Sequence, residues 1–426
     1  MGGSPGRSHR LRLALVLASL AASAAVAEPA PFREPDGGGP AALPAEDPLD
    51  PDRRAEIEAR LQAGRTGRAR PGLAPGLATP SFAFPLRAAS GFPDAGFHAV
   101  SNFVDLDPTF PDQLLDFACG ERTYDRLDGY NHSGTDFFVW PFEWRRMFEA
   151  QVRVVAAAPG VILAKDDGHF DGHCASNTQP WNAVYVEHAD GSVAWYGHLK
   201  EGSTTSKPVG GSVATGDYLG IVGSSGSSTG PHLHFEVHDP DDDPMDPFAG
   251  PCGAAASLWT EQPAYYDSAL NRISTHDAPP QTDTCNAAEE THERNRFDPG
   301  EVVFYAAFYR DQLAGQTSTY TIRRPNGSVH STWQHASPVP HYVASWWYWW
   351  QTLPGDAPFG TWRFEVSYLG QDEAHAFHVP EPAAWAQGGV ALVAVAAMAG
   401  AGRPRPSVKR RAVSRGDQAI SRPRIA

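Results

Sequence analysis

Residues 223–237, with the sequence GSSGSSTGPHLHFEV, place two histidines two residues apart directly after a loop rich in Gly and Ser. If the second half of this stretch forms a β-strand, alternate side chains point to opposite faces. His232 and His234 then share one face, while Leu233 and Phe235 share the other. The stretch therefore predicts a strand with one apolar face and one face that carries two imidazoles, which are common ligands of transition metals.

The residues that would complete a metal site lie upstream, in the sequence NHSGTD at residues 131–136. His132 and Asp136 are four residues apart, and Gly134 between them favours a loop or a strand end over a helix. Together with His234 they offer two nitrogen ligands and one carboxylate oxygen. The fourth tetrahedral position of a zinc ion would stay open for water, which is typical of catalytic zinc sites. The H-E-x-x-H motif, which many zinc proteases carry on a helix, is absent from the sequence.

A second group of potential ligands occurs in the sequence HFDGH at residues 169–173. It contains His169, Asp171 and His173, which are the residue types that a metal site uses. Because it lies in a stretch rich in Gly, Asp and Asn next to Cys174, we interpret it as a surface loop.

Residues 81–250 have the pattern of an all-β domain, because short apolar runs alternate with Gly, Asp, Asn and Pro. Asp190-Gly191 predicts a hairpin turn between two of these runs, since a type I′ turn needs a positive φ that glycine tolerates. His198 is therefore expected at the end of a strand, from which the sheet can bring it toward His232 and His234. The runs predicted to be strands are residues 152–158, 161–164, 183–187, 193–196 and 218–222.

Residues 255–378 form a second β-rich segment, in which Asn326-Gly327 predicts another hairpin. The pattern favours a small Ig-like β-sandwich. The sequence WWYWW at residues 346–350 places aromatic side chains on both faces of one strand. A sandwich core buries one face only, so we expect the catalytic domain to cover the other, with a ligand-binding platform as the alternative.

The two ends of the chain have the features of export and sorting signals. Arginines precede an apolar run at residues 13–25, and Ala25-Val26-Ala27 provides a small-x-small cleavage site, which predicts a secretory signal peptide. Near the C-terminus, VPEP at residues 379–382 precedes an apolar run at residues 388–401 and a basic cluster. This run is shorter than the ~20 residues of a membrane-spanning helix, which favours a processed sorting signal over a permanent anchor.

The composition of the remaining sequence indicates where the predicted segments begin and end. Residues 28–80 are rich in Pro, Ala, Gly and charge, which is typical of a linker or propeptide, with one helix expected near residues 53–62. A solvated spacer is favoured over a propeptide that blocks the active site. The predicted segments are a signal peptide (1–27), a linker or propeptide (28–80), a catalytic β domain (81–250), a β-sandwich (255–378), a sorting tail (379–411) and a disordered tail (412–426).

Charge and cysteine content restrict the function further. The net charge of −15 argues against a nucleic-acid partner, which would require a basic face. Four cysteines in an exported chain predict two disulfides. Proximity within the predicted domains favours the pairs Cys119–Cys174 and Cys252–Cys285.

Three motifs now carry a family resemblance. H-x-G-x-D at residues 132–136, Y-G-H-L at residues 196–199 and G-x-x-T-G-P-H-L-H-F-E at residues 226–236 resemble, in identity and order, the M23 (lysostaphin-type, LytM-like) metallopeptidases. The resemblance covers about residues 131–237. It implies an antiparallel β catalytic domain in which zinc binds to three residues, namely His132, Asp136 and His234. It also implies that His198 and His232 are not ligands and instead flank the zinc-bound water.

This division of roles agrees with the chemistry of the residues. A neutral imidazole beside a zinc-bound water can take its proton, and a second one can stabilise the oxyanion. Either His198 or His232 serves as the base and the other as the stabiliser. The resemblance implies an exported endopeptidase that cleaves peptide cross-links of bacterial peptidoglycan. The alternatives are a non-catalytic regulator of cell-wall amidases, as some family members are, and a surface matrix or adhesion protein.

The C-terminal tail resembles the PEP-CTERM signal of exported bacterial proteins. In such signals a Pro-Glu-Pro motif precedes an apolar stretch and an arginine cluster. The resemblance implies processing by an exosortase and a location in the periplasm, at the cell surface or outside the cell. It departs from the pattern in length, because the chain continues to Ala426 past the basic cluster.

Overall fold

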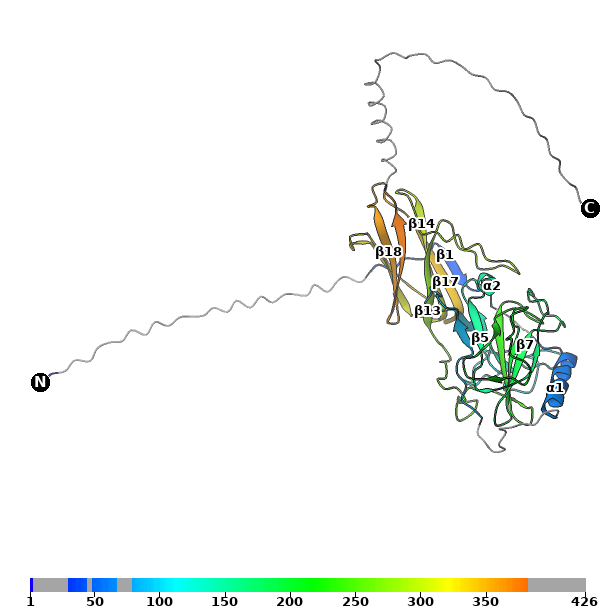
Figure 1. Ribbon diagram of the computed structural model, residues 1–426. Coiled ribbons are helices and arrows are strands. Elements are labelled where there is room, and N and C mark those ends of the chain that lie inside the picture. The colour runs from blue at the N-terminus through cyan, green and yellow to red at the C-terminus, as the bar shows by residue number, and fades with distance from the viewer. Residues whose placement is uncertain (3–29, 44–47, 67–78, 382–426) are drawn as a thin grey trace, which may run out of the picture. The chain divides into compact units, whose positions relative to one another are not determined.

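The computed structural model describes residues 1–2, 30–43, 48–66 and 79–381 (Figure 1). The described part is mostly β, with antiparallel sheets, as the sequence predicted. We call residues 81–250 the first β region and residues 255–378 the second β region.

The first β region contains α2 and most of the shorter strands. Their bounds are β2 Leu86–Ala88, β3 His98–Val100, β4 Gly134–Val139, α2 Glu143–Phe148, β5 Val152–Val155, β6 Gly160–Asp166, β7 Ala183–Glu187, β8 Val193–Gly197, β9 Ser212–Val213, β10 Tyr218–Ile221, β11 His232–His238 and β12 Pro244–Met245.

Two antiparallel sheets of this region enclose its core. The larger sheet has the strand order β3-β4-β11-β8-β7-β6-β9, with β12 paired to β11, and the smaller one has the order β10-β5-β2. Leu233, Phe235 and Val237 of β11 lie in the core beside Val154 of β5. The predicted alternation along β11 is therefore confirmed, and its histidines lie on the opposite face. The hairpin at Asp190-Gly191 joins β7 to β8 as predicted.

The second β region, together with β1 (Gly37–Pro40), forms a sandwich of two four-stranded antiparallel sheets, with the orders β1-β17-β14-β13 and β16-β15-β18-β19. The bounds are β13 Ala269–His276, β14 Val302–Leu313, β15 Thr317–Arg323, β16 Val329–Ala336, β17 His341–Thr352, β18 Gly360–Tyr368 and β19 Gln371–Val379. The predicted hairpin at Asn326-Gly327 joins β15 to β16.

Strand β17 carries the aromatic run on both faces. Trp347 and Trp349 lie in the core of the sandwich. Trp346 and Tyr348 pack on the other side, in a cluster that includes Phe138 and Trp140 of the first β region. Packing between the two β regions therefore accounts for much of the second aromatic face, as expected, while Trp350 stays 45% exposed.

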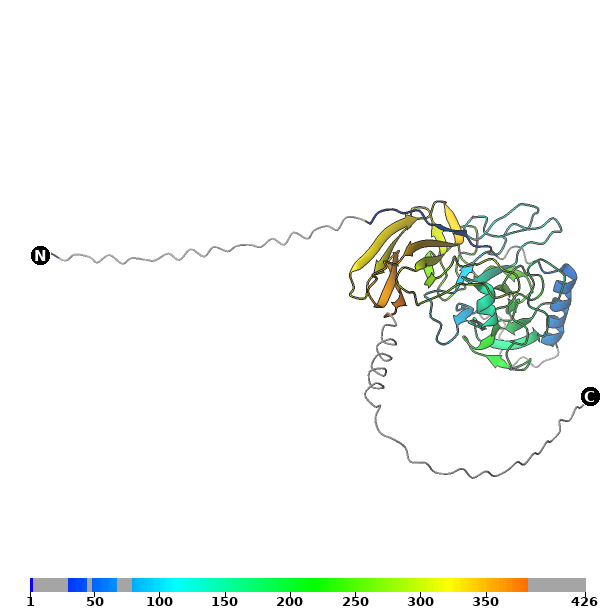
Figure 2. The same ribbon diagram turned by 90° about the horizontal axis from the view of Figure 1, so that it is seen from above.

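The segment before the first β region is structured where it is described. Residues Gly37–Pro40 form β1, which pairs with β17. Residues Pro51–Thr66 form α1, drawn in blue against the first β region (Figures 1 and 2). The predicted helix is confirmed, but the interpretation of these residues as a solvated spacer is wrong. Ile57 and Leu61 of α1 are buried against the larger sheet of the first β region.

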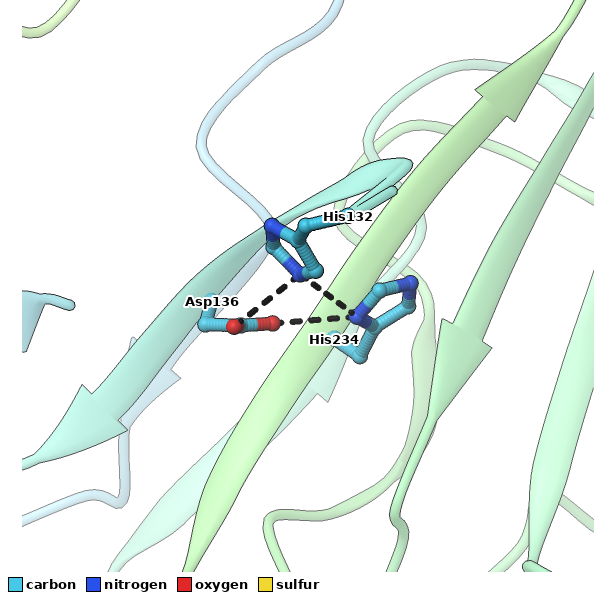
Figure 3. Close-up of side chains that lie close together, drawn as sticks. All are labelled: His132, Asp136 and His234. Carbon is cyan, nitrogen blue, oxygen red and sulfur yellow. Dashed lines mark hydrogen bonds and ion pairs between the residues drawn. The ribbon is translucent and has the colours of Figure 1, made fainter. Parts of the chain in front are cut away.

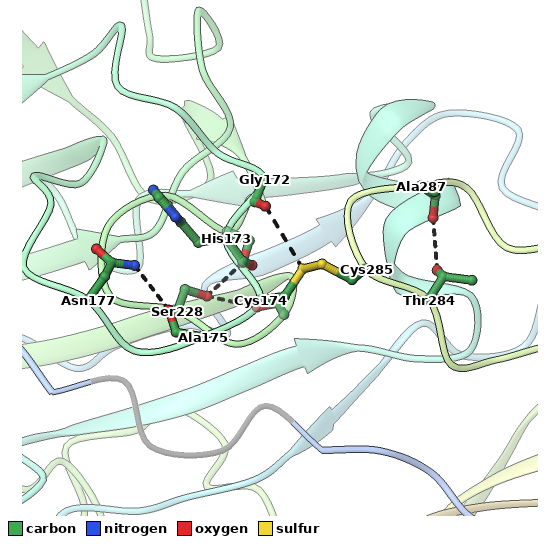
Figure 4. Close-up of a disulfide and its surroundings, with 11 residues drawn as sticks. Gly172, His173, Cys174, Ala175, Asn177, Ser228, Thr284, Cys285 and Ala287 are labelled. Carbon is green, nitrogen blue, oxygen red and sulfur yellow. Dashed lines mark hydrogen bonds between the residues drawn. A yellow bond between two sulfur atoms is a disulfide. The ribbon is translucent and has the colours of Figure 1, made fainter.

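The two disulfides are confirmed in number but not in pairing. The structure joins Cys119 to Cys252 and Cys174 to Cys285. The loop after β12 returns to the first β region, where the Cys252 N–H donates to the Phe117 carbonyl at 3.1 Å. The loop between β13 and β14 carries Cys285 to the HFDGH loop (Figure 4). Proximity in sequence failed because the fold brings distant loops together.

The predicted terminal signals lie almost entirely outside the described residues. This applies to the signal peptide beyond residue 2 and to the apolar and basic parts of the sorting tail. Among the residues with a described structure, no helix is both long enough and apolar enough to cross a membrane.

Candidate metal centre

Two neighbouring strands position the candidate ligands. β4 and β11 pair in an antiparallel register that places Asp136 opposite His234. His132 precedes β4 by two residues and lies beside both (Figure 3). Gly134 permits this approach, because a Cβ atom added there would lie 2.6 Å from Nε2 of His234. The glycine of the H-x-G-x-D motif is therefore required by close packing.

The three side chains converge on one point, as the sequence predicted (Figure 3). His132 Nε2 lies 3.0 Å from Asp136 Oδ2 and 3.3 Å from His234 Nδ1. His234 Nδ1 lies 3.0 Å from Asp136 Oδ1. Among the residues that the structure describes, this is the group of three potential ligands whose donor atoms all lie within 4.8 Å of one another.

Hydrogen bonds fix which atom of each side chain faces the centre. The Nδ1–H of His132 donates to the Phe103 carbonyl at 2.7 Å, which leaves Nε2 as the ligand atom. The Nε2–H of His234 donates to the Glu236 carboxylate at 3.1 Å, which leaves Nδ1. Asn102 Nδ2 donates to Asp136 Oδ2 at 2.9 Å. Oriented imidazoles and a hydrogen-bonded carboxylate are what a bound metal ion requires, so these residues fit one.

His198 and His232 lie next to this group, as predicted. The Nδ1–H of His198 donates to the Ser225 carbonyl at 2.7 Å, and that of His232 donates to the Gly230 carbonyl at 2.8 Å. Their ring centroids are 4.4 Å apart, and His232 Nε2 lies 3.9 Å from Asp136 Oδ1. His198 follows β8 with a φ of +58°, a left-handed conformation that is uncommon outside glycine and often occurs at functional sites.

A second set of residues lies behind His234, and the family resemblance assigns none of them a role, although Glu236 ends the third motif. The carboxylate of Glu236 is fully buried and accepts two hydrogen bonds from the Arg54 guanidinium, at 2.7 and 3.0 Å. Burial would raise the pKa of Glu236, but the charges of Arg54 and His238 and the hydrogen bonds from His234 and His238 hold it well below its ordinary value. Because side chains alternate along a strand, the position of Glu236 two residues after His234 predicts that both lie on the same face. No sequence signal connects Arg54 to the site.

Aromatic rings cover the histidines. The Trp181 ring centroid lies 5.0 Å from that of His198 and 5.9 Å from that of His234. Tyr124 stacks on His132 at 4.7 Å. The burial is nearly complete, since none of His132, Asp136, His198, His232 and His234 is more than 2% exposed.

Known proteins share the sequence around this centre. Residues 131–247 match the family model described as peptidase family M23. The DD-carboxypeptidase/endopeptidase Mpg of Neisseria meningitidis serogroup B and that of Neisseria gonorrhoeae are each 42% identical over 84 residues, which is 20% of this chain and 16% of each relative. The cell division protein DipM of Caulobacter vibrioides is 33% identical over 119 residues, or 25% of this chain and 18% of DipM. The chain thus spans less than a fifth of the length of these curated relatives.

Two solved structures are also similar. One is the catalytic domain of a point mutant of the prophage-encoded M23 protein EnpA from Enterococcus faecalis, at 21% identity and a TM-score of 0.22, covering 41% of this chain and 94% of that one. The other is an M23 peptidase from Pseudomonas aeruginosa, at 23% identity and a TM-score of 0.23, covering 46% and 58%. TM-scores this low support no conclusion about this chain.

Proposed function

We propose that this chain, whose residues 131–247 form a domain of peptidase family M23, is a zinc metalloendopeptidase that hydrolyses peptide cross-links of peptidoglycan. The observation that carries the proposal is the convergence of His132, Asp136 and His234 around one point, with hydrogen bonds that orient each of them. The family match to residues 131–247 supports the peptidase activity.

Zinc is the ion that best suits this donor set. Two imidazole nitrogens and one carboxylate oxygen are the protein ligands of many catalytic zinc sites. His132 would bind through Nε2, His234 through Nδ1 and Asp136 through its carboxylate. Bound there, zinc would lower the pKa of a water ligand toward ~7 and polarise the scissile carbonyl.

His198 and His232 would handle the proton and the developing charge. Because each Nδ1–H is held by a backbone carbonyl, each neutral ring has its lone pair on Nε2. One ring accepts the proton of the attacking water and then, as imidazolium, donates it to the leaving amine. The other takes a proton from solvent and, as imidazolium, donates a hydrogen bond from Nε2 to the oxyanion. Either histidine can fill either role.

The relatives and the chain ends support the proposed substrate and location. The curated relatives named DD-carboxypeptidase/endopeptidase support a cell-wall peptide as the substrate. The signal-like sequence at residues 1–27 supports export to the periplasm, the cell surface or the medium. The tail at residues 379–411 supports processing by an exosortase.

A second candidate function is non-catalytic regulation of cell-wall amidases. The match to a protein named for cell division favours this candidate. The retention of all five site positions favours catalysis instead, because a regulator has no need of oriented ligands and two adjacent imidazoles. The two functions differ in whether the purified protein itself hydrolyses peptidoglycan.

A turbidity assay on purified peptidoglycan tests the proposal. The protein without its predicted signal peptide should clear the suspension, a chelator should stop clearing, and added zinc should restore it. The Asp136→Ala variant should be inactive under every condition. Clearing that continues at the same rate with chelator would contradict the zinc peptidase and show that the activity has another origin. A protein that clears nothing, but increases clearing by an added amidase, would identify the regulator.

A further inference from the structure

The segment at residues 48–66 lies on the face of the larger sheet that carries the metal centre. His234 and Glu236 share that face, and the register of β11 with β8 places Trp195 opposite Glu236. Ile57 and Leu61 of α1 pack in one cluster with Trp195. The helix therefore covers the surface that continues from the metal centre along the sheet.

Arg54 connects α1 directly to the centre. Its guanidinium binds both oxygens of Glu236 and donates to Ser133 Oγ at 2.8 Å. Ser133 follows the candidate ligand His132, and Glu236 accepts from the candidate ligand His234. One side chain of the N-terminal segment thus contacts the surroundings of two of the three candidate ligands.

Leu49 lies between two hollows in the surface. One hollow, of about 250 Å³, is bordered by Trp181 and His169, and the other, of about 240 Å³, by Tyr130 and Asn177. Leu49 borders both and packs in the same buried cluster as Trp181. The N-terminal segment therefore borders both hollows, with residues 126–130 and 176–178 on one side of Leu49 and residues 166–169 and 180–181 on the other.

We infer that residues 48–66 are an intramolecular inhibitor that occupies the substrate groove and must leave it before a peptide can bind. This inference rests on the proposed function. A peptide carbonyl must come within about 3 Å of the catalytic imidazoles, yet His198 and His232 are at most 1% exposed. Access thus requires a covering element to move, and residues 48–66 take part in neither disulfide.

The contacts of the segment are suited to release. Apart from Leu49, Ile57 and Leu61, the contacts of this segment with the sheet are mostly ion pairs, including Arg60 with the partly exposed Asp166. The exposed pairs among them are weak and depend on ionic strength, whereas the Arg54–Glu236 pair is buried, and its contacts are exchanged for solvent when the helix leaves. The helix can therefore detach without disturbing the core on the far side of the sheet.

A pair of full-length variants tests the inference. Ile57→Glu/Leu61→Glu places two carboxylates in the buried contact and should favour the detached state. Ala59→Glu makes the same kind of change on the exposed side of α1 and is the matched control. Two readouts are needed: hydrolysis of peptidoglycan, and the rate at which diethyl pyrocarbonate modifies His198 and His232 in metal-free protein, measured by peptide mass spectrometry.

The double variant should show a rise of about tenfold or more in both readouts, and Ala59→Glu should behave as the wild type. Faster modification without hydrolysis in any variant would support occlusion and count against the peptidase function. Unchanged modification in the double variant would overturn the inference. A loss of hydrolysis together with a loss of bound zinc would also overturn it, because α1 would then support the site rather than block it.

A disulfide between α1 and β6 provides a test that does not depend on the folding of the double variant. A Cβ atom at Gly64 would lie 3.1 Å from Cδ1 and 3.6 Å from Cγ of Leu163, so Gly64→Cys/Leu163→Cys can link the two elements. The linked protein should lose hydrolysis and histidine modification relative to Gly64→Cys alone. Hydrolysis at the rate of the single variant would overturn the inference, because the helix would then not need to leave.

Discussion

Two groups of histidine and aspartate residues in the first β region have the same composition but different structures. His132, Asp136 and His234 come from two paired strands and are buried with their donor atoms together. The HFDGH loop instead uses its polar groups to bind neighbouring segments of the chain. The Asp171 carboxylate accepts the Glu201 N–H at 2.8 Å.

The comparison shows that convergence depends on strand register rather than on residue type or spacing. The histidine and aspartate of H-x-G-x-D meet a third ligand from a distant strand because β4 and β11 are adjacent. The histidines of the HFDGH loop have no such partner strand in the described part of the chain. The Cys174–Cys285 disulfide fixes this loop to the second β region beside Ser228 (Figure 4), which gives it a structural role.

Alanine substitutions in the two groups should give the largest contrast. His132→Ala, Asp136→Ala or His234→Ala should abolish zinc binding and lower hydrolysis by at least about 10³-fold, because the ion provides the main electrostatic stabilisation. His173→Ala should leave both unchanged. Metal analysis and a peptidoglycan assay measure the effects. Equal losses from the two groups would refute the distinction between them.

Substitution of the two remaining imidazoles should separate catalysis from metal binding. His198→Ala and His232→Ala should each lower kcat by about 10²- to 10⁴-fold, because each removes a group that handles a proton or the oxyanion in the proposed mechanism. Zinc content should stay at one ion per chain. A variant that loses its zinc would show that the histidine is a ligand after all.

Glu236→Gln should have a smaller effect. Its carboxylate accepts the Nε2–H of His234 and so holds the ring with Nδ1 toward the centre. We expect zinc affinity to fall by about 10- to 100-fold, measured by competition with a chromophoric chelator. Asp171→Asn is the matched change in the HFDGH loop and should leave zinc affinity unaltered. An unchanged affinity in Glu236→Gln would mean that the ring is oriented by packing alone.

Substitution of Asp246 should have the smallest effect, which is a change in stability that depends on pH. Burial raises the pKa of Asp246 to about 7, so the folded state holds a proton that the unfolded state loses near pH 4. The associated stability is fully present below about pH 4 and is lost as the pH rises toward 7. Asp246→Asn mimics the protonated form and should gain about 1 to 2 kcal/mol over the wild type at pH 8 but not at pH 4. Urea unfolding at both pH values measures the free energy of unfolding of the two proteins. An equal difference between variant and wild type at pH 4 and pH 8 would contradict the raised pKa of Asp246.

Much of the fold and the candidate site could be predicted because local patterns encode them. Alternation along β11 and the Gly-containing turns depend on neighbours in sequence, and the ordered motifs identified five residues that the structure brings together. The disulfide partners and the packing of α1 could not be predicted, because they depend on which distant loops the fold brings together. Arg54 is one of many charged residues in a polar segment, and only the buried Glu236 gives it a special position.

The most direct test of the metal centre is anomalous X-ray diffraction at the zinc edge from crystals of the zinc-loaded protein. We predict one peak, about 2.0 to 2.2 Å from His132 Nε2, His234 Nδ1 and an Asp136 carboxylate oxygen. The absence of a peak there, or a peak at the HFDGH loop instead, would contradict the proposed centre.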